Sequence, residues 1–488
     1  MSAAGNKLEK IITQANAALE RENLGSALML YRKALSMDKQ NPKLMLRLGQ
    51  VLLASGYASE AVGVLQTAAK RRANHPGTQV VLAQAHLTLG DMDSMHASLD
   101  RAIAQSPGYG AAVLAKVNAY IDSGLTESAV QCMDHYADLA DPDPLLNLAR
   151  AKVAIATKDH ARAIDALQQI LDTPNAPDRH KRSARFEMGT VHDAMGDYDQ
   201  AFSYFQLANS GHHLGKPIHP QSIQSTWSHE VLASIPRSTI SDERPVIIAG
   251  MPRSGTTLTE RIINAHPLGA SVGECPILLQ QSSRTLCANL DQALINEYAK
   301  EYLGLLDEQA GSQATRVVDK HMGTEKSLGL ISRVLPGARI IHALRDPRDC
   351  CLSAYFQNFG TNVQYSRDLT QLGQQYVAHR EMMEYWKEHL DLEFYTNIYE
   401  EFVGDAESRT RELIAFLGLG FDEACLRFHE AKDHVHTASA TQVRKPVYQS
   451  SRQRWKNYEQ HLGPLLDALG PFADGVHAQQ GPSTRNAT

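Results

Sequence analysis

Small and apolar positions recur at a fixed interval through the first half of the chain. Successive steps of 34 residues connect Ala27, Ala61, Met95, Ala129 and Ala163. Apolar residues between these positions follow the helical period, and each interval contains a polar turn segment. The spacing predicts stacked pairs of helices, with small residues where the two helices of a pair cross.

The predicted turns repeat at the same interval. Glycines lie 34 residues apart at Gly56, Gly90 and Gly124. A sixth unit, with Gly196 in its turn, arrives four residues late because 174–182 holds an insertion. This pattern resembles the tetratricopeptide repeat, so we expect an all-α solenoid of about six repeats over 1–215.

The resemblance to tetratricopeptide repeats implies a concave groove that binds a peptide or partner protein. A stacking spacer and a dimerisation surface are the alternatives. The sequence does not predict the oligomeric state.

A different pattern follows residues 216–244, which are rich in Pro, His and Ser and which we interpret as a linker. Residues 246–249 form a continuous apolar run, as a buried parallel strand requires. The loop G-M-P-R-S-G-T-T (250–257) comes next, and apolar residues at helical spacing follow it. A strand, a loop and a helix start in this order present backbone N–H groups to an anion.

This loop differs from the loop that binds nucleoside triphosphates at one informative position. Thr256 stands where that loop has a Lys that reaches the β- and γ-phosphates. The difference argues against ATP or GTP hydrolysis. Arg253 supplies a positive charge earlier in the loop, which suits a single 5′-phosphate that carries one further group.

A second predicted strand, 338–344, ends at a basic residue. Arg345 follows the strand directly, and Ser353 lies eight residues later in a predicted helix. Ligands of α/β sheets bind at the carboxyl ends of parallel strands. The guanidinium fork of Arg345 and the hydroxyl of Ser353 are suited to a second phosphate.

The motifs P-R-S-G-T-T (252–257) and R-x7-S (345–353) together resemble those of the sulfotransferase family, with greatest similarity to the tyrosylprotein sulfotransferases. Further family motifs are matched in order by His266-Pro267, Gly273-Glu274, Asp319-Lys320, 399–402, 439–447 and Arg454-Trp455. The chain departs from the family at Ala440, Arg444, Arg454 and Gln357. The resemblance covers about 245–470 and implies a P-loop-like α/β domain with a parallel sheet.

The resemblance also implies 3′-phosphoadenosine 5′-phosphosulfate (PAPS) as co-substrate, with no metal. It assigns the 5′-phosphosulfate to Arg253, Ser254, Gly255, Thr256 and Thr257, and the 3′-phosphate to Arg345 and Ser353. It assigns further nucleotide contacts to Tyr399, Lys445 and Arg454.

Four residues are the expected catalytic groups. Glu274 is matched to the family's general base, which takes the proton of the acceptor hydroxyl. His321 is the alternative base, since an ordinary imidazole titrates near neutral pH. Lys320 would stabilise negative charge on the bridging oxygen of the leaving nucleotide, and Ser439 would donate a hydrogen bond to the same oxygen.

We therefore expect a PAPS-dependent sulfotransferase whose repeat domain binds the acceptor or a partner protein. The acceptor hydroxyl stays open between peptide tyrosine, carbohydrate, lipid and a small phenol. A nucleotide kinase of the P-loop class and a non-catalytic repeat scaffold are the alternative functions.

Composition narrows the classes of protein further. The 488 residues include 48 Lys and Arg against 54 Asp and Glu, a net charge of −6, so binding of nucleic acid over the whole chain is not expected. Six scattered Cys exclude a disulfide scaffold and a zinc site. Without a leader-like or membrane-length apolar run, we expect a cytoplasmic protein with no membrane span. Residues 471–488 are predicted to form a disordered tail.

Overall fold

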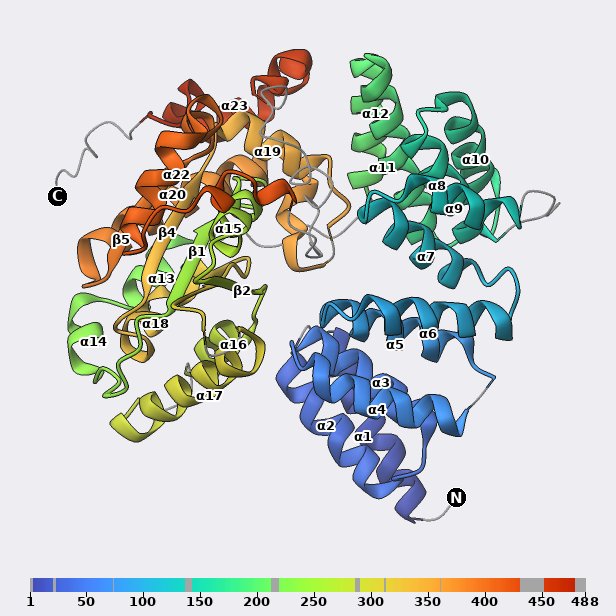
Figure 1. The fold of residues 1–488 in the computed structure, drawn as a ribbon, viewed down its shortest axis with the longest axis horizontal. Coiled ribbons are helices and arrows are strands. Elements are labelled where there is room, and N and C mark those ends of the chain that lie inside the picture. The colour runs from blue at the N-terminus through green and yellow to red at the C-terminus, as the bar shows by residue number, and fades with distance from the viewer. Residues whose placement is uncertain are drawn as a thin grey trace. The chain divides into compact units, whose positions relative to one another are not determined.

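The computed structural model describes residues 3–20, 23–72, 74–136, 143–211, 219–285, 290–310, 313–359, 361–430 and 452–478. The described residues fall into two compact units, one up to Val191 and the other from His192 onward. Figure 1 shows helices alone in the first part of the chain and strands with helices in the second.

The first unit is a series of helices that pack in consecutive pairs. In chain order they are α1 (Ala3–Glu20), α2 (Leu24–Met37), α3 (Pro42–Ala54), α4 (Ala58–Arg71), α5 (Pro76–Thr88), α6 (Met92–Gln105), α7 (Gly110–Asp122), α8 (Thr126–Asp134), α9 (Pro144–Ala156) and α10 (His160–Asp172). The helix α11 (Asp178–Met195) runs from this unit into the second. The prediction of stacked helix pairs is confirmed.

The predicted 34-residue period has a physical basis in burial. The residues at the repeated small position are almost inaccessible to solvent: Ala27, Ala61, Met95, Ala129 and Ala163. A larger side chain at an alanine of this series would separate the helices that pack against it. The period therefore follows from close approach of the helices.

The turn glycines have a second basis, which is backbone conformation. Gly56, Gly90 and Gly124 have φ values of 84°, 73° and 75°, in the left-handed region that glycine adopts without steric cost. The fifth turn places Lys158 at the equivalent position, with φ 61°. The fold imposes the left-handed conformation there although the residue carries a side chain.

The second unit contains a five-stranded parallel sheet in the order β2-β3-β1-β4-β5. The strands are β1 (Pro245–Gly250), β2 (Gly269–Gly273), β3 (Arg316–Asp319), β4 (Arg339–Leu344) and β5 (Glu393–Ile398). Ile247 and Val246 lie in different hydrophobic clusters, one on each face of the sheet. Burial on both faces explains why these strands are continuous apolar runs in the sequence.

Helices surround this sheet in the chain order of the second unit. They are α12 (Tyr198–Asn209), α13 (Pro220–Thr226), α14 (His229–Ser234), α15 (Thr256–Asn264), α16 (Ile277–Thr285), α17 (Gln292–Ala310), α18 (Leu328–Val334), α19 (Pro347–Tyr355), α20 (Leu369–His389), α21 (Tyr399–Gly404), α22 (Ala406–Phe416) and α23 (Gly463–Leu469). The two predicted strands and the predicted helix at Thr256 agree with β1, β4 and α15.

The structure differs from the predicted segment boundaries at three places. The helix α12, expected within the repeats, packs on the second unit through Phe205 and Phe356, whose ring centroids are 3.9 Å apart. The expected linker 216–244 contains α13 and α14, and its Trp227 is buried in the core.

The third difference concerns the predicted tail. Residues Gly470–Asp474 form a 3-10 helix, η6, and Phe472 is buried against the guanidinium of Arg380. Residues 479–488 lie outside the described part of the chain. None of the described helices is long and apolar enough to cross a membrane.

Candidate active site

The carboxyl ends of all five strands carry the predicted site residues. Gly250 ends β1 and opens the phosphate loop; Glu274, Lys320, Arg345 and Tyr399 directly follow β2, β3, β4 and β5. Because parallel strands end at the same edge of a sheet, these segments of the chain meet there. The central strand β1 has its two neighbours on opposite sides, at the point where the order of the strands reverses.

The phosphate loop has a backbone that excludes larger side chains. A Cβ at Gly250 would lie 2.6 Å from Ser254 Oγ and 2.9 Å from the carbonyl oxygen of Ala343. Gly255, the N-cap of α15, has φ 99° and provides no side chain to cap the helix. The first N–H groups of α15 are therefore left for an anion, as the sequence predicts.

Ser254 adds a hydroxyl to this loop. The residue is 2% exposed, and Ser254 Oγ has no hydrogen-bond partner among the described residues. A buried hydroxyl without a partner costs free energy, which a bound acceptor oxygen would offset. The loop residues therefore fit a phosphate or phosphosulfate group.

A second polar cluster lies beside the loop. Arg253, with φ 71°, donates from Nε to Ser353 Oγ over 2.9 Å, and both residues are buried. Arg345 Nη1 donates to the carbonyl oxygen of Arg253 over 3.1 Å, and its guanidinium lies 4.9 Å from the ring centroid of Tyr399. The structure thus brings Arg253, expected at the 5′-phosphosulfate, to the pair expected at the 3′-phosphate.

Tyr399 also contacts the phosphate loop. A Cβ at Gly255 would lie 3.1 Å from Tyr399 Cδ2, so the ring packs directly against the loop backbone. The predicted position of this residue beside the nucleotide site therefore agrees with its contacts.

Lys320 lies between two carboxylates. Its Nζ is 2.9 Å from Glu274 Oε1 and 3.6 Å from Glu260 Oε2. The side chain of Lys320 is 3% exposed, whereas that of Glu274 is 38% exposed. Ser271 Oγ donates to the other oxygen of Glu260 over 2.6 Å. Glu274 is therefore the carboxylate of this group that an incoming acceptor can reach.

Sequence reasoning missed Glu260 and Ser271. Glu260 lies four residues after Thr256 in the helix that opens at the loop, so it shares a face with that threonine. That spacing could have identified it as a site residue. Ser271 carries no comparable signal, because its role depends on how β2 lies beside α15.

Asp319 connects the segments that carry the catalytic candidates. Its Oδ1 accepts the backbone N–H groups of Cys275 and His321, at 3.3 and 3.2 Å, and Tyr302 donates its hydroxyl to Oδ2 at 3.3 Å. Burial raises the pKa of Asp319 to about 7. This side chain fixes the residues next to Glu274 and Lys320.

His321, the alternative base, is partly buried, and burial lowers its pKa. Its Nδ1 donates to the carbonyl oxygen of Met322 over 2.8 Å, so Nε2 is the basic nitrogen. Glu274 is close enough to His321 for its charge to raise the same pKa. The structure thus brings both candidate bases to one edge of the sheet.

Two expected contacts cannot be placed and one lies elsewhere. Ser439 and Lys445 lie outside the described residues. Arg454 Nη2 pairs with Asp193 Oδ2 at 2.6 Å, and its guanidinium lies over the ring of Phe356. The described contacts of Arg454 are those of a structural ion pair and do not include the phosphate loop.

The chain offers anion-binding groups rather than metal ligands at this edge. In the described ranges, no three His, Cys, Asp or Glu side chains are grouped as a metal ion would require. A buried hydroxyl, two arginines and helix N–H groups are the donors present near the loop.

Comparison with known proteins agrees with this geometry. Residues 245–423 match the profile of the sulfotransferase family, and residues 18–77 match that of the tetratricopeptide repeat. An uncharacterised protein of Aquifex aeolicus is 31% identical over 63% of this chain and 44% of its own length. The protein-tyrosine sulfotransferase of Drosophila melanogaster is 24% identical over 48% of this chain and 53% of its own.

The chain spans about half the length of these two relatives. Among solved structures, a sulfotransferase domain of a Synechococcus olefin synthase gives a TM-score of 0.35 at 18% identity, covering 46% of this chain and 91% of that domain. From the profile matches and the parallel sheet, we conclude that the chain carries a sulfotransferase-family domain, preceded by a tetratricopeptide repeat region.

Proposed function

We propose that the second unit is a PAPS-dependent sulfotransferase that acts on a hydroxyl, with residues 245–470 as its catalytic domain. The observation that carries the proposal is the buried ammonium of Lys320, paired with the more exposed carboxylate of Glu274 at the edge that holds the phosphate loop. A base and a cation at this edge are the groups that sulfuryl transfer requires.

The loop and the neighbouring cluster account for nucleotide binding. Ser254 donates its hydroxyl, and the first N–H groups of α15, including those of Thr256 and Thr257, bind the 5′ group. Arg345, Arg253 and Ser353 bind the 3′-phosphate as charged and hydroxyl donors. When bound, PAPS supplies the sulfuryl group that is transferred to the acceptor.

Glu274 orients the acceptor hydroxyl and takes its proton as the oxygen becomes nucleophilic. Lys320 stabilises negative charge on the bridging oxygen, in a water-poor site where electrostatic interactions are strong. Glu260 keeps a counter-charge beside Lys320 when the carboxylate of Glu274 is protonated. The protein therefore contributes position and charge, which suits a loose in-line transfer.

We infer a peptide or protein as the acceptor class, with tyrosine as the first hydroxyl to test. The named relative from Drosophila melanogaster is a protein-tyrosine sulfotransferase, and a repeat array provides an extended surface for a peptide. The repeat region would then bind the acceptor or a partner protein.

Calorimetric titration with 3′-phosphoadenosine 5′-phosphate (PAP), followed by turnover of labelled PAPS with tyrosine peptides, tests the proposal. We expect Glu274→Gln to bind PAP like the wild type while turnover falls at least about a hundredfold. Glu297→Gln, an exposed carboxylate on α17, is the matched control.

Normal turnover in Glu274→Gln together with loss of turnover in His321→Ala would transfer the role of base to His321. Failure of the wild type to bind PAP would contradict the sulfotransferase assignment. ATP consumption with a nucleoside acceptor would replace it with a kinase.

A further inference from the structure

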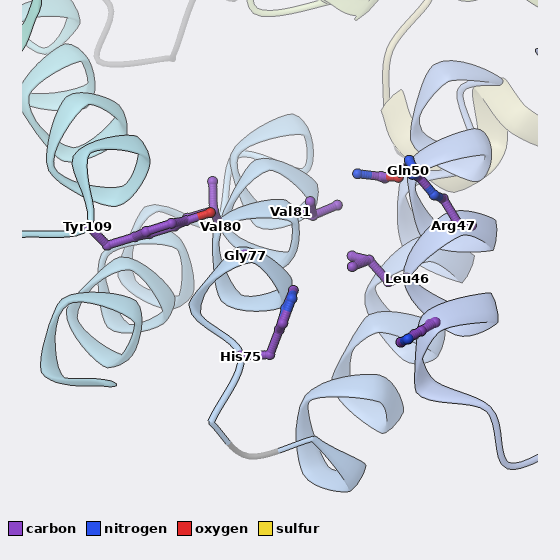
Figure 2. Close-up of a pocket in the computed structure, with 9 residues that line it drawn as sticks. Leu46, Arg47, Gln50, His75, Gly77, Val80, Val81 and Tyr109 are labelled. Atoms are coloured by element: carbon purple, nitrogen blue, oxygen red, sulfur yellow. Dashed lines mark hydrogen bonds between the residues drawn. The ribbon is translucent and has the colours of Figure 1, made fainter. Parts of the chain in front are cut away.

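A pocket in the repeat region has a lining that the fold does not require. It has a volume of 430 Å³, which is in the range of small-ligand sites. Its lining comes from α3, from α5 and from the residues that precede α5 and α7. Figure 2 shows Leu46, Val81, His75 and Tyr109 around the space between these helices.

The lining residues occupy equivalent positions of successive repeats. One 34-residue step relates Lys43 to Gly77, Leu46 to Val80, Arg47 to Val81 and His75 to Tyr109. The next step leads to Ala111 from Gly77 and to Ala115 from Val81. Positive charge at these positions is therefore a feature of the second repeat alone in this series, and helix stacking is achieved elsewhere without it.

Both cations remain available to a ligand. Lys43 and Arg47 are exposed, and neither is in an ion pair with the described residues. Arg47 Nη1 makes a neutral contact, a 3.1 Å hydrogen bond to Gln50 Oε1. No acidic side chain lines the pocket. Lys43 and Arg47 are one helical turn apart on α3, so both can reach one anionic group.

The rest of the lining defines what accompanies the anion. Leu46, Val80 and Val81 form an apolar part. Thr78 donates its backbone N–H to His75 Nδ1 over 3.2 Å, so the neutral ring carries its proton on Nε2 and can donate it. The pocket thus combines cations, a further donor and apolar surface.

Gly77 controls the space beneath the two rings. A Cβ at this position would lie 3.1 Å from His75 Cε1 and 3.4 Å from Tyr109 Oη. A large residue at position 77 would therefore fill the pocket while leaving its charges in place.

We propose that this pocket binds an acidic segment of a partner peptide, with a carboxylate between Lys43 and Arg47 and a neighbouring apolar side chain on Leu46, Val80 and Val81. Charge complementarity selects the anion, and the apolar surface selects a carbon-rich neighbour over a bare ion. The inference rests on the proposed peptide-binding role of the repeat region and not on the sulfuryl-transfer reaction.

Fluorescence anisotropy with the full chain tests this proposal. The probe is a labelled pool of short peptides with a fixed central Glu and random flanks, and the matched pool has Gln at the centre. We expect the Glu pool to bind more tightly, with an affinity that falls as salt is added. Lys43→Ala combined with Arg47→Ala should weaken binding about tenfold.

Two variants separate the pocket from general effects. Gly77→Leu should abolish binding with both charges retained, whereas Lys10→Ala, an exposed cation on α1, should leave it unchanged. Equal binding of the Glu and Gln pools, or no effect of the pocket variants, would overturn the proposal. Competition by free glutarate at concentrations equal to the peptide would assign the pocket to a small dicarboxylate instead.

Titration of PAP into the same variants keeps this test independent of the proposed enzyme activity. We expect the pocket variants to bind PAP as the wild type does. A wild-type chain that binds the Glu pool but not PAP would retain the pocket proposal and remove the sulfotransferase assignment.

Discussion

The ammonium of Lys320 lies 2.9 Å from the carboxylate of Glu274, and the lysine is almost completely buried while the glutamate is not. This pair joins the end of β3 to the segment after β2. A buried cation needs a counter-charge throughout a reaction, and Glu260 provides a second one at 3.6 Å. The arrangement lets Glu274 accept a proton while Lys320 remains paired.

Replacement of the second counter-charge tests this relationship. In Glu260→Gln we expect kcat to fall about tenfold or more, with a smaller change in KM for PAPS, because Lys320 loses the partner that positions it. Ser271→Ala, which removes only a hydrogen bond to Glu260, should have a smaller effect. Steady-state kinetics measure both, and unchanged kcat in Glu260→Gln would remove its positioning role.

The unpartnered hydroxyl of Ser254 should trade stability for affinity. In Ser254→Ala we expect the free protein to melt at the same or a higher temperature, because a buried orphan group is removed. The affinity for PAP should fall about tenfold, as expected for a lost hydrogen bond to a charged group.

Ser327 offers a matched control for this variant. Its hydroxyl is also buried without a partner among the described residues, but it lies in the 3-10 helix η1 (Thr324–Ser327), away from the loop in sequence. Ser327→Ala should preserve PAP affinity. Equal PAP affinity in Ser254→Ala and the wild type would show that Ser254 does not bind the nucleotide.

Asp319 should make stability depend on pH. Its pKa is about 7 in the folded protein and about 3.9 in an unfolded chain, so between these values the folded state binds more protons. Stability therefore falls as pH rises from 4 to 7, by an amount on the order of 4 kcal/mol at most. Asp319→Asn keeps the acceptor oxygen and removes this titration.

Thermal melts of both proteins across this pH range check the prediction. We expect the wild type to lose more stability than Asp319→Asn as pH rises. Parallel curves for the two proteins would mean that Asp319 does not take up a proton in that range.

Lys158 should be a position at which glycine stabilises the chain. Its left-handed backbone carries a steric cost that Gly does not have, so Lys158→Gly should increase stability by about 0.5–1 kcal/mol. Gly124→Lys, at the equivalent turn one repeat earlier, should destabilise the repeats by a similar amount.

Urea unfolding with two probes can separate the units. All three Trp, at 227, 386 and 455, lie in the second unit, so their fluorescence reports that unit while far-ultraviolet dichroism reports all helices. The substitution at Lys158 should shift the dichroism and not the fluorescence. No shift in dichroism would indicate that the turn carries no strain.

The repeats and the phosphate loop were predictable because each depends on local chemistry. A 34-residue period follows from small residues at helix crossings, and residues 245–264 read directly as strand, loop and helix. The boundaries were less predictable. The place of α12 depends on Phe205 packing on Phe356, which lies far away in the sequence.

The candidate site was predictable as a set of residues but not as a network. Glu274, Lys320 and Arg345 could be named because family motifs mark them and strands precede them. The role of Glu260 depends on the approach of α15 to the end of β3, and the ion pair of Arg454 with Asp193 depends on contacts across the second unit.

The sequence by itself determined the helix repeat, the parallel strands, the phosphate loop and the identity of the charged candidates, because local periodicity and short motifs encode these features. Only the tertiary structure decided which charges share a partner. It placed Lys320 between two carboxylates, turned Arg253 toward Ser353, and raised the pKa of Asp319. Burial and pairing arise from residues far apart in the chain, so they are properties of the folded arrangement.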